Sequence, residues 1–161
     1  MIRYLFATDE EAQDFCNAAG GELPKGKVDV VGVGAQDMLR YREEDTVINI
    51  GYCRSNNVIT GMIIEPSYVL SATTGEIIRI TPVFPVESRL CVTCDRLENE
   101  TMKNCFAIYD TELFNIAANH KGKVHALKIV EGRLSFGGRP NVNELEQWAK
   151  VVELVRRSIK E

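Results

Sequence analysis

The sequence contains no apolar run close to the ~20 residues that a membrane-spanning helix needs. It also lacks an excess of basic residues, since 19 Lys and Arg stand against 23 Asp and Glu and the net charge is -4. Nucleic-acid-binding domains usually carry a basic stripe, so we expect neither a membrane nor a nucleic acid as partner. The short apolar start runs directly into acids and does not fit a signal peptide, so we expect a cytoplasmic protein.

Cysteine and histidine are sparse. The five cysteines are an odd number, which does not fit a secreted disulfide framework. Residues 91–94 match a CxxC spacing, but they lie in a run typical of a strand, where residues three apart point to opposite faces. No second CxxC or His pair completes a zinc site, so we expect no metal and no cofactor. His120 and His125 match no nucleophilic pattern, and we interpret both as structural.

What the sequence does contain is an alternation of strand and helix signals. Apolar runs at 47–50 and 126–130 are nearly continuous, which is typical of strands covered on both faces. Alternation of such runs with helical segments indicates an α/β fold. The length of 161 residues suits one domain, with no repeat and no linker.

The expected elements follow from the apolar runs and from helix start and stop signals. Strands are predicted at 2–7, 28–33, 46–50, 68–72, 90–93, 105–109 and 124–130, with a hairpin arm at 77–81. Helices are predicted at 9–19, 36–42, 113–120 and 143–160. Gly20 and Gly21 are expected to end the first helix, and Trp148 lies on the apolar face of the last.

Acidic residues directly follow the predicted strand 105–109. Asp110 and Glu112 stand between this strand and a helix, and another apolar strand follows the helix. In α/β sheets, ligands bind where strands end and helices begin, so we expect the ligand there. An alternative role for both acids is to cap the helix and to complement its dipole.

Polar residues also follow other predicted strands. Thr8 and Glu11 fit a capping box, which on its own is the simpler interpretation of Glu11. Residues 32–34 either bring backbone N–H groups close to a ribose or phosphate or form a plain tight turn. Arg54 either pairs with an anion or is solvated, and Asp95 either acts in a site or initiates a turn.

Taken together and in order, these segments resemble the nucleoside phosphorylase and nucleosidase superfamily, in particular methylthioadenosine/adenosylhomocysteine nucleosidases. The resemblance runs from Met1 to about Leu134. It is carried by residues 6–11 (first strand and acidic helix start), 32–34 ("G-[IV]-G"), 47–51 (the strand ending in "N-T-G-[ST]-A-G-G"), 92–95 (a strand ending in Asp near the base), 109–112 ("D-M-E") and 128–134 ("K-I-V-S-D-x-L").

The resemblance implies a single three-layer α/β domain over residues 1–161, with a central mixed, mostly parallel sheet. It implies that Glu11 activates the attacking water, that Glu112 holds the ribose hydroxyls, and that Asp95 or Glu131 is the acid at the base. Further substrate contacts are implied for Thr111, Gly34, Tyr52 and Arg54. The implied partner is a small purine nucleoside, and family analogy suggests a homodimer.

The sequence also departs from the family pattern. Gly132 stands where the family has its acidic Asp, and Glu131 stands one residue earlier, where a strand aims the side chain to the other face. Because the base must be protonated as it leaves, loss of this acid would cost roughly 10²–10⁴-fold in rate. Thr111 replaces the signature methionine, residues 52–55 replace "S-A-G-G", and the segment 81–89 is compressed.

The sequence leaves more than one function open. The first is a nucleoside-binding protein that cleaves N-ribosyl bonds or descends from enzymes that do. Hydrolysis is favoured over phosphorolysis, because no set of arginines fits a phosphate. The alternative is a non-catalytic protein that keeps the fold for ligand sensing or assembly. A flavodoxin-like module also fits the alternation, but the sequence lacks its phosphate-binding loop.

Overall fold

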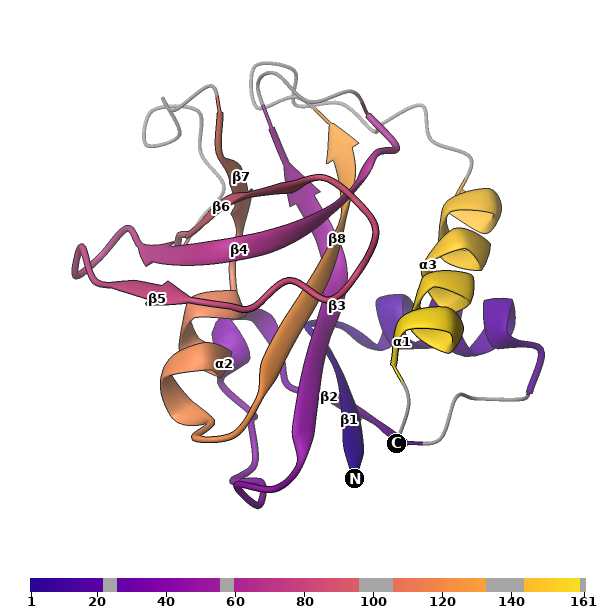
Figure 1. The fold of residues 1–161 in the computed structure, drawn as a ribbon, viewed down its shortest axis with the longest axis horizontal. Helices are drawn as coiled ribbons and strands as arrows, with labels where there is room; N and C mark the ends of the chain where they lie inside the picture. Colours follow the sequence, from indigo (N-terminus) through magenta and orange to yellow (C-terminus); the bar gives the residue numbers. More distant parts are fainter. Residues whose placement is uncertain (22–25, 56–59, 96–105, 133–143, 160–161) are drawn as a thin grey trace.

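The computed structural model describes residues 1–21, 26–55, 60–95, 106–132 and 144–159. Three helices and eight strands follow one another within these ranges (Figure 1). They are β1 (Ile2–Phe6), α1 (Asp9–Ala19), β2 (Lys27–Val30), β3 (Thr46–Arg54), β4 (Ile63–Ser71), β5 (Ile77–Arg79), β6 (Ser88–Thr93), β7 (Ile108–Asp110), α2 (Leu113–Asn119), β8 (Val124–Gly132) and α3 (Glu144–Ser158), with one 3-10 turn at Val33–Ala35. None of the helices in these ranges is long and apolar enough to span a membrane.

The eight strands form one mixed sheet, part of which closes on itself. β3 pairs with β8, β8 with β4, β4 with β6, β6 with β7, and β7 with β3 again. The β8–β4 and β7–β3 pairs are antiparallel, and the other three are parallel. β1 and β2 extend the sheet in parallel from β3, and β5 forms an antiparallel arm on β4. The centre of the sheet is therefore a closed, five-stranded barrel.

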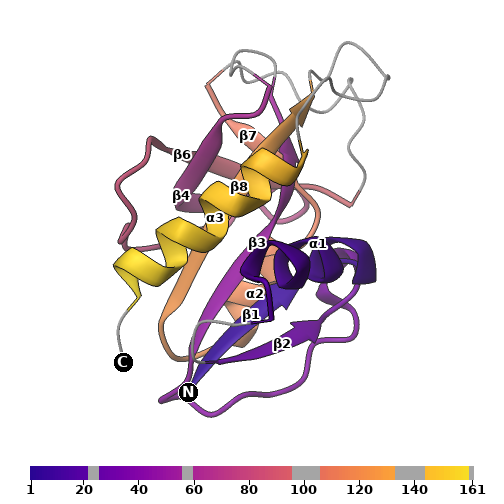
Figure 2. The ribbon, with the colours of Figure 1, turned by 90° about the vertical axis from the view of Figure 1, so that its right-hand side faces the viewer.

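The closed barrel corrects the expected three-layer arrangement, whereas the single α/β domain and the mixed, mostly parallel sheet agree with the prediction. α1 and α3 pack together on one face of the sheet, as Figure 2 shows, around an apolar cluster that includes Trp148. α2 contributes Leu113 and Phe114 to a second cluster, with barrel residues such as Ile64 and Val130. Long, twisted strands coil until their edges meet, which removes unpaired edges.

Local signals account for both boundaries of α1. The Thr8 hydroxyl accepts a hydrogen bond from the Glu11 backbone N–H (3.2 Å), and Gly20 ends α1 in the left-handed conformation, so α1 spans the predicted residues. The predicted helix at 36–42 is wrong, because the chain forms only the turn Val33–Ala35 there. Gly34 has a φ of 73° within that turn, and the Asp37 N–H donates back to the Val31 carbonyl instead of continuing a helix.

Four strands, β3, β4, β6 and β8, are longer than predicted. β3 continues through Gly51 to Arg54 because β8 pairs with it along its whole length, and Gly51 lies opposite Lys128. Tyr52 and Arg54, expected in a loop, are therefore strand residues. Cys91 and Cys94 lie in two different apolar clusters, as the strand interpretation of the CxxC spacing predicts.

Candidate functional site

The candidate site lies where β1 and β7 end, α1 and α2 begin, and β3 and β8 run side by side through their middles. Glu11 comes from the first turn of α1, Glu112 from the start of α2, and Lys128 from the middle of β8. These three charged side chains are almost fully buried, with 7%, 3% and 0% of their surface exposed. Charges are rarely buried so deeply unless they are paired, so each of these groups needs partners inside the protein.

Lys128 is the centre of this cluster. Its Nζ lies 2.6 Å from Glu112 Oε1 and 3.0 Å from Asp110 Oδ2. Burial on its own would lower the pKa of Lys128, but the two carboxylates more than offset it and hold that pKa above its ordinary value. Lys128 is therefore a permanent buried cation that fixes two carboxylates.

Asp110 joins the cluster to the start of α2. Its Oδ1 accepts a hydrogen bond from the Thr93 hydroxyl (2.6 Å), and its Oδ2 accepts one from the Leu113 N–H (2.9 Å). Thr93 Oγ1 in turn accepts from the Phe114 N–H (3.0 Å). Asp110 thus satisfies the first turn of the helix, which was one of the two roles considered for it.

Glu112 has a different role from Asp110. It occupies the N-cap position of α2 but its side chain makes no capping hydrogen bond there. Instead, Oε1 accepts from Lys128 and Oε2 accepts from the Thr111 hydroxyl (2.8 Å). A carboxylate has about four acceptor positions, so Glu112 retains positions for further donors.

Glu11 faces the same cluster from α1. Its Oε2 accepts the Tyr52 backbone N–H (2.8 Å), and its Oε1 accepts the Thr8 hydroxyl (3.2 Å). Burial and then the charge of Glu112 raise the pKa of Glu11 to about 7, although these two hydrogen bonds and Lys128 lower it. A carboxyl group with this pKa is about half ionised near neutral pH, as a general base for that pH requires.

Gly51 allows β3 to pass close to Glu11. A Cβ atom at Gly51 would lie 2.5 Å from Glu11 Oε2, which is inside van der Waals contact. Any larger residue would push the Glu11 carboxylate away from the Tyr52 N–H. Gly51 therefore leaves room for the Glu11 carboxylate beside β3, and it does not end that strand.

Of the remaining predicted residues, two are held by contacts with α2 or α3, and three lie at partly exposed or exposed strand ends. Gly34 lies beside the start of α2, where its carbonyl accepts a hydrogen bond from the Asn115 side chain (2.9 Å). Tyr52 packs edge-on against the Trp148 ring and accepts its Nε1–H (2.9 Å). Arg54 and Glu131, by contrast, form a partly exposed ion pair (3.5 Å) near the ends of β3 and β8, and Asp95 is exposed beyond the end of β6.

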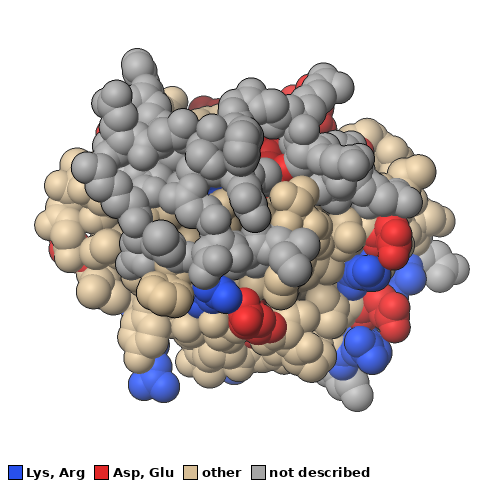
Figure 3. Space-filling view, turned by 90° about the horizontal axis from the view of Figure 1, so that it is seen from above, with Lys and Arg blue, Asp and Glu red and all other residues tan. Residues whose placement is uncertain are grey.

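The structure thus brings Glu11 and Glu112 together with residues that the sequence reasoning did not assign. Asp110 was predicted either to lie at the ligand site or to cap the helix, and Lys128 was only part of the motif at 128–134. The available signal was a single Lys inside the otherwise apolar run 126–130, because a lone charge at a doubly covered strand position needs buried partners. Figure 3 views the molecule from the end where β3 and β8 finish, and basic and acidic side chains of the described residues are interspersed on that face.

No protein-family model matches this sequence, and no curated protein matches it. Solved structures match it along nearly the whole chain. An MTAN from Chlamydia trachomatis is 15% identical, with a TM-score of 0.76 over 99% of this chain and 98% of that one. The same kind of protein bound to MTA is 14% identical, with a TM-score of 0.72 over 98% and 94%. A 5′-methylthioadenosine nucleosidase from Arabidopsis thaliana is 16% identical, with a TM-score of 0.65 over 98% and 91%.

At these identities the likeness shows the fold alone. The chain has the fold of the MTA/SAH nucleosidases, so the resemblance that the motif order indicated is confirmed, although the three-layer arrangement is not. A shared fold does not fix the role of a site residue, which depends on the geometry of this chain's own side chains.

Proposed function

We propose that this chain binds a purine nucleoside at the Glu11–Glu112 site and slowly hydrolyses its N-ribosyl bond. The observation that carries the proposal is the pair of buried carboxylates. Glu11 and Glu112 lie close enough for one to raise the pKa of the other, beside the junctions of β1 with α1 and of β7 with α2. The nucleosidase fold supports the same assignment.

In this proposal Glu11 accepts a proton from the attacking water. The Tyr52 N–H and the Thr8 hydroxyl hold its carboxylate in one orientation, which leaves the remaining lone pairs for the water. Glu112, fixed by Lys128 and Thr111, accepts hydrogen bonds from the ribose hydroxyls. The position of each carboxylate is set before the substrate arrives, which lowers the cost of orienting the groups.

The excess of carboxylates suits the reaction electrostatically. Cleavage of an N-ribosyl bond passes through an oxocarbenium-like state, in which positive charge develops on the ribose. Among the described residues of this cluster, three buried acids, Glu11, Asp110 and Glu112, stand against one buried cation, Lys128. Fixed negative charge in a buried site stabilises a developing cation more than the neutral substrate.

The slow rate follows from the leaving-group side. Gly132 carries no acid, and the neighbouring Glu131 is paired with Arg54. The leaving base would take its proton from solvent, so we expect a rate roughly 10²–10⁴-fold below that of a site with a positioned acid.

The absence of an acid at Gly132 also favours a second candidate function, that of a protein which binds the nucleoside and does not cleave it. In that case the Glu112–Lys128 pair would recognise the ribose, and binding would be the output. The two candidates make different predictions for release of the base.

The test combines binding and cleavage on the same samples. The full chain is screened for thermal shifts with adenosine, inosine, methylthioadenosine, adenosylhomocysteine and adenine, and released base is followed by chromatography. Release that disappears in Glu11→Gln but persists in Glu10→Gln, an exposed neighbour, would support hydrolysis. A shift without release would support the second candidate, and the absence of any shift would contradict both.

A further inference from the structure

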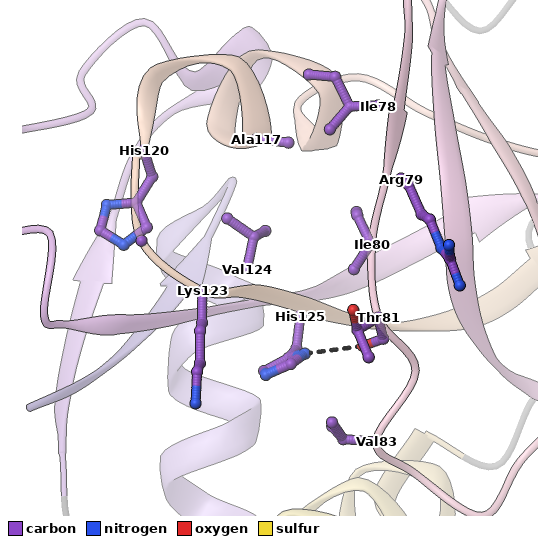
Figure 4. A pocket seen from close by; sticks show the side chains of 11 residues that line it. Ile78, Arg79, Ile80, Thr81, Val83, Ala117, His120, Lys123, Val124 and His125 are labelled. Atoms are coloured by element: carbon purple, nitrogen blue, oxygen red, sulfur yellow. Dashed lines mark hydrogen bonds between the residues drawn. The ribbon is translucent and has the colours of Figure 1, made fainter.

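A separate cavity lies at the other end of α2. It has a volume of about 450 Å³ and lies between the segment 78–83, the start of β8 and the end of α2 (Figure 4). Cavities that hold small organic molecules are typically ~300–1,000 Å³, so it is large enough for one. Lys128 lies four residues beyond Val124 on β8, or ~13 Å along the strand. The cavity is therefore distinct from the nucleoside site.

The inner part of the cavity is apolar. Ile80 belongs to the buried core of the barrel, and Ile78, Ala117 and Val124 are partly buried against that core. Figure 4 shows these four side chains together above His125. The barrel core is thus incompletely covered here, and a bound apolar group would remove further apolar surface from water.

The polar part of the cavity is cationic. Arg79 and Lys123 line it and are exposed, and no Asp or Glu occurs among its described lining residues. Within the described parts of the chain, neither cation has an acidic partner at ion-pair distance. Two cations without an acidic partner are unusual in a chain with a net charge of -4, because acidic residues outnumber basic ones in its sequence.

His125 forms a fixed wall between Lys123 and Thr81 (Figure 4). Its Nδ1 lies 3.1 Å from the Thr81 carbonyl oxygen, which can only accept, so Nδ1 carries the proton. The His125 ring is thereby held in one orientation beside the apolar part of the cavity.

We propose that this cavity is a ligand site for a small organic carboxylate with an apolar body. The apolar body occupies the space beside Ile78, Ala117 and Val124, and the carboxylate lies toward Lys123. An anion with an apolar body uses both the uncovered core and this unpaired cation, whereas a neutral apolar molecule uses only the uncovered core. The proposal does not depend on the nucleoside site.

The test uses octanoate and indole-3-acetate as probes, with octanamide and indole-3-acetamide as uncharged counterparts. Binding to the full chain is followed by the backbone amide signals of Ala117, Val124 and His125 in nuclear magnetic resonance spectra. We expect the carboxylates to shift these signals, with an affinity roughly tenfold or more above that of the amides, since tenfold corresponds to one ordinary charged contact.

Two variants with the same change of net charge provide the control. Lys123→Glu removes a lining cation and should weaken carboxylate binding roughly tenfold or more. Lys121→Glu, two residues earlier, exposed and outside the lining, should leave it unchanged. The proposal is overturned if no probe shifts these signals, if the amides bind as well as the carboxylates, or if both variants weaken binding equally.

Discussion

The two ends of α2 have opposite surroundings. At its start, Lys128 holds the buried carboxylates of Asp110 and Glu112, and the buried Glu11 faces the same cluster. At its end lies a cavity whose two cations have no acidic partner within the described residues. Acids next to the start of a helix complement its dipole, whereas the last turn of α2 holds no basic residue and both cavity cations come from outside the helix. Burial is what differs, because it fixes the acids in one orientation around Lys128, whereas the exposed cations of the cavity have no acidic partner within the described residues.

The largest expected effect is the loss of Lys128. Lys128→Met leaves Asp110 and Glu112 buried without their cation, which we expect to lower the free energy of unfolding by about 3–5 kcal/mol. Urea unfolding near neutral pH measures it. Lys123→Met, at the exposed cavity rim, should stay within about 0.5 kcal/mol of the unsubstituted protein. Equal, small losses in both variants would remove the contrast between the two ends of α2.

Glu11 should give the site a characteristic dependence of stability on pH. Because folding raises the pKa of Glu11 from 4.5 to about 7, the folded state holds this proton more tightly than the unfolded state. The contribution of Glu11 to the free energy of unfolding is therefore fully present below pH 4.5. It is lost as the pH rises to about 7, which lowers the free energy of unfolding by about 3 kcal/mol in total. Glu11→Gln should lack this component of the pH dependence, whereas Glu10→Gln should keep it. Parallel unfolding curves for Glu11→Gln and the unsubstituted protein between pH 5 and 8 would contradict the assignment.

Gly51 should give a smaller effect. Gly51→Ala places a methyl group against Glu11 Oε2, which we expect to cost about 1–3 kcal/mol through crowding. Since the crowding comes from the Glu11 side chain, the substitution should cost less in a Glu11→Ala background. A double-mutant cycle by urea unfolding measures this coupling. Additive losses would show that Gly51 is needed for some reason other than the approach of Glu11.

Much of the fold could be predicted because its signals are local. The end of β7, its acidic turn, α2 and β8 follow one another as the apolar runs and helix signals predict. Closure of the barrel could not be predicted, because it depends on pairs such as Ile63 with Ile129 that are remote in sequence. The helix at 36–42 was predicted wrongly because glycines with positive φ, at 32 and 34, redirect the chain before a helix can begin.

The site was predictable only in part, for the same reason. Motif order singled out Glu11 and Glu112, and the structure brings these two carboxylates together. The contributions of Lys128 and Gly51 depend on their register, which places them opposite one another on β8 and β3 beneath the start of α1. Neither residue has a neighbour in sequence that indicates this pairing, so local patterns could not reveal it.

The most direct test of the account is a calorimetric titration of methylthioadenosine into the unsubstituted protein and into Glu112→Gln. The backbone spectrum of the variant establishes that it remains folded, and Glu10→Gln serves as the control with the same change of charge. The account predicts a saturable heat of binding for the unsubstituted protein and for Glu10→Gln, with an affinity at least about tenfold lower in Glu112→Gln. Unchanged affinity in a folded Glu112→Gln protein would contradict the assignment of Glu112 to the ribose.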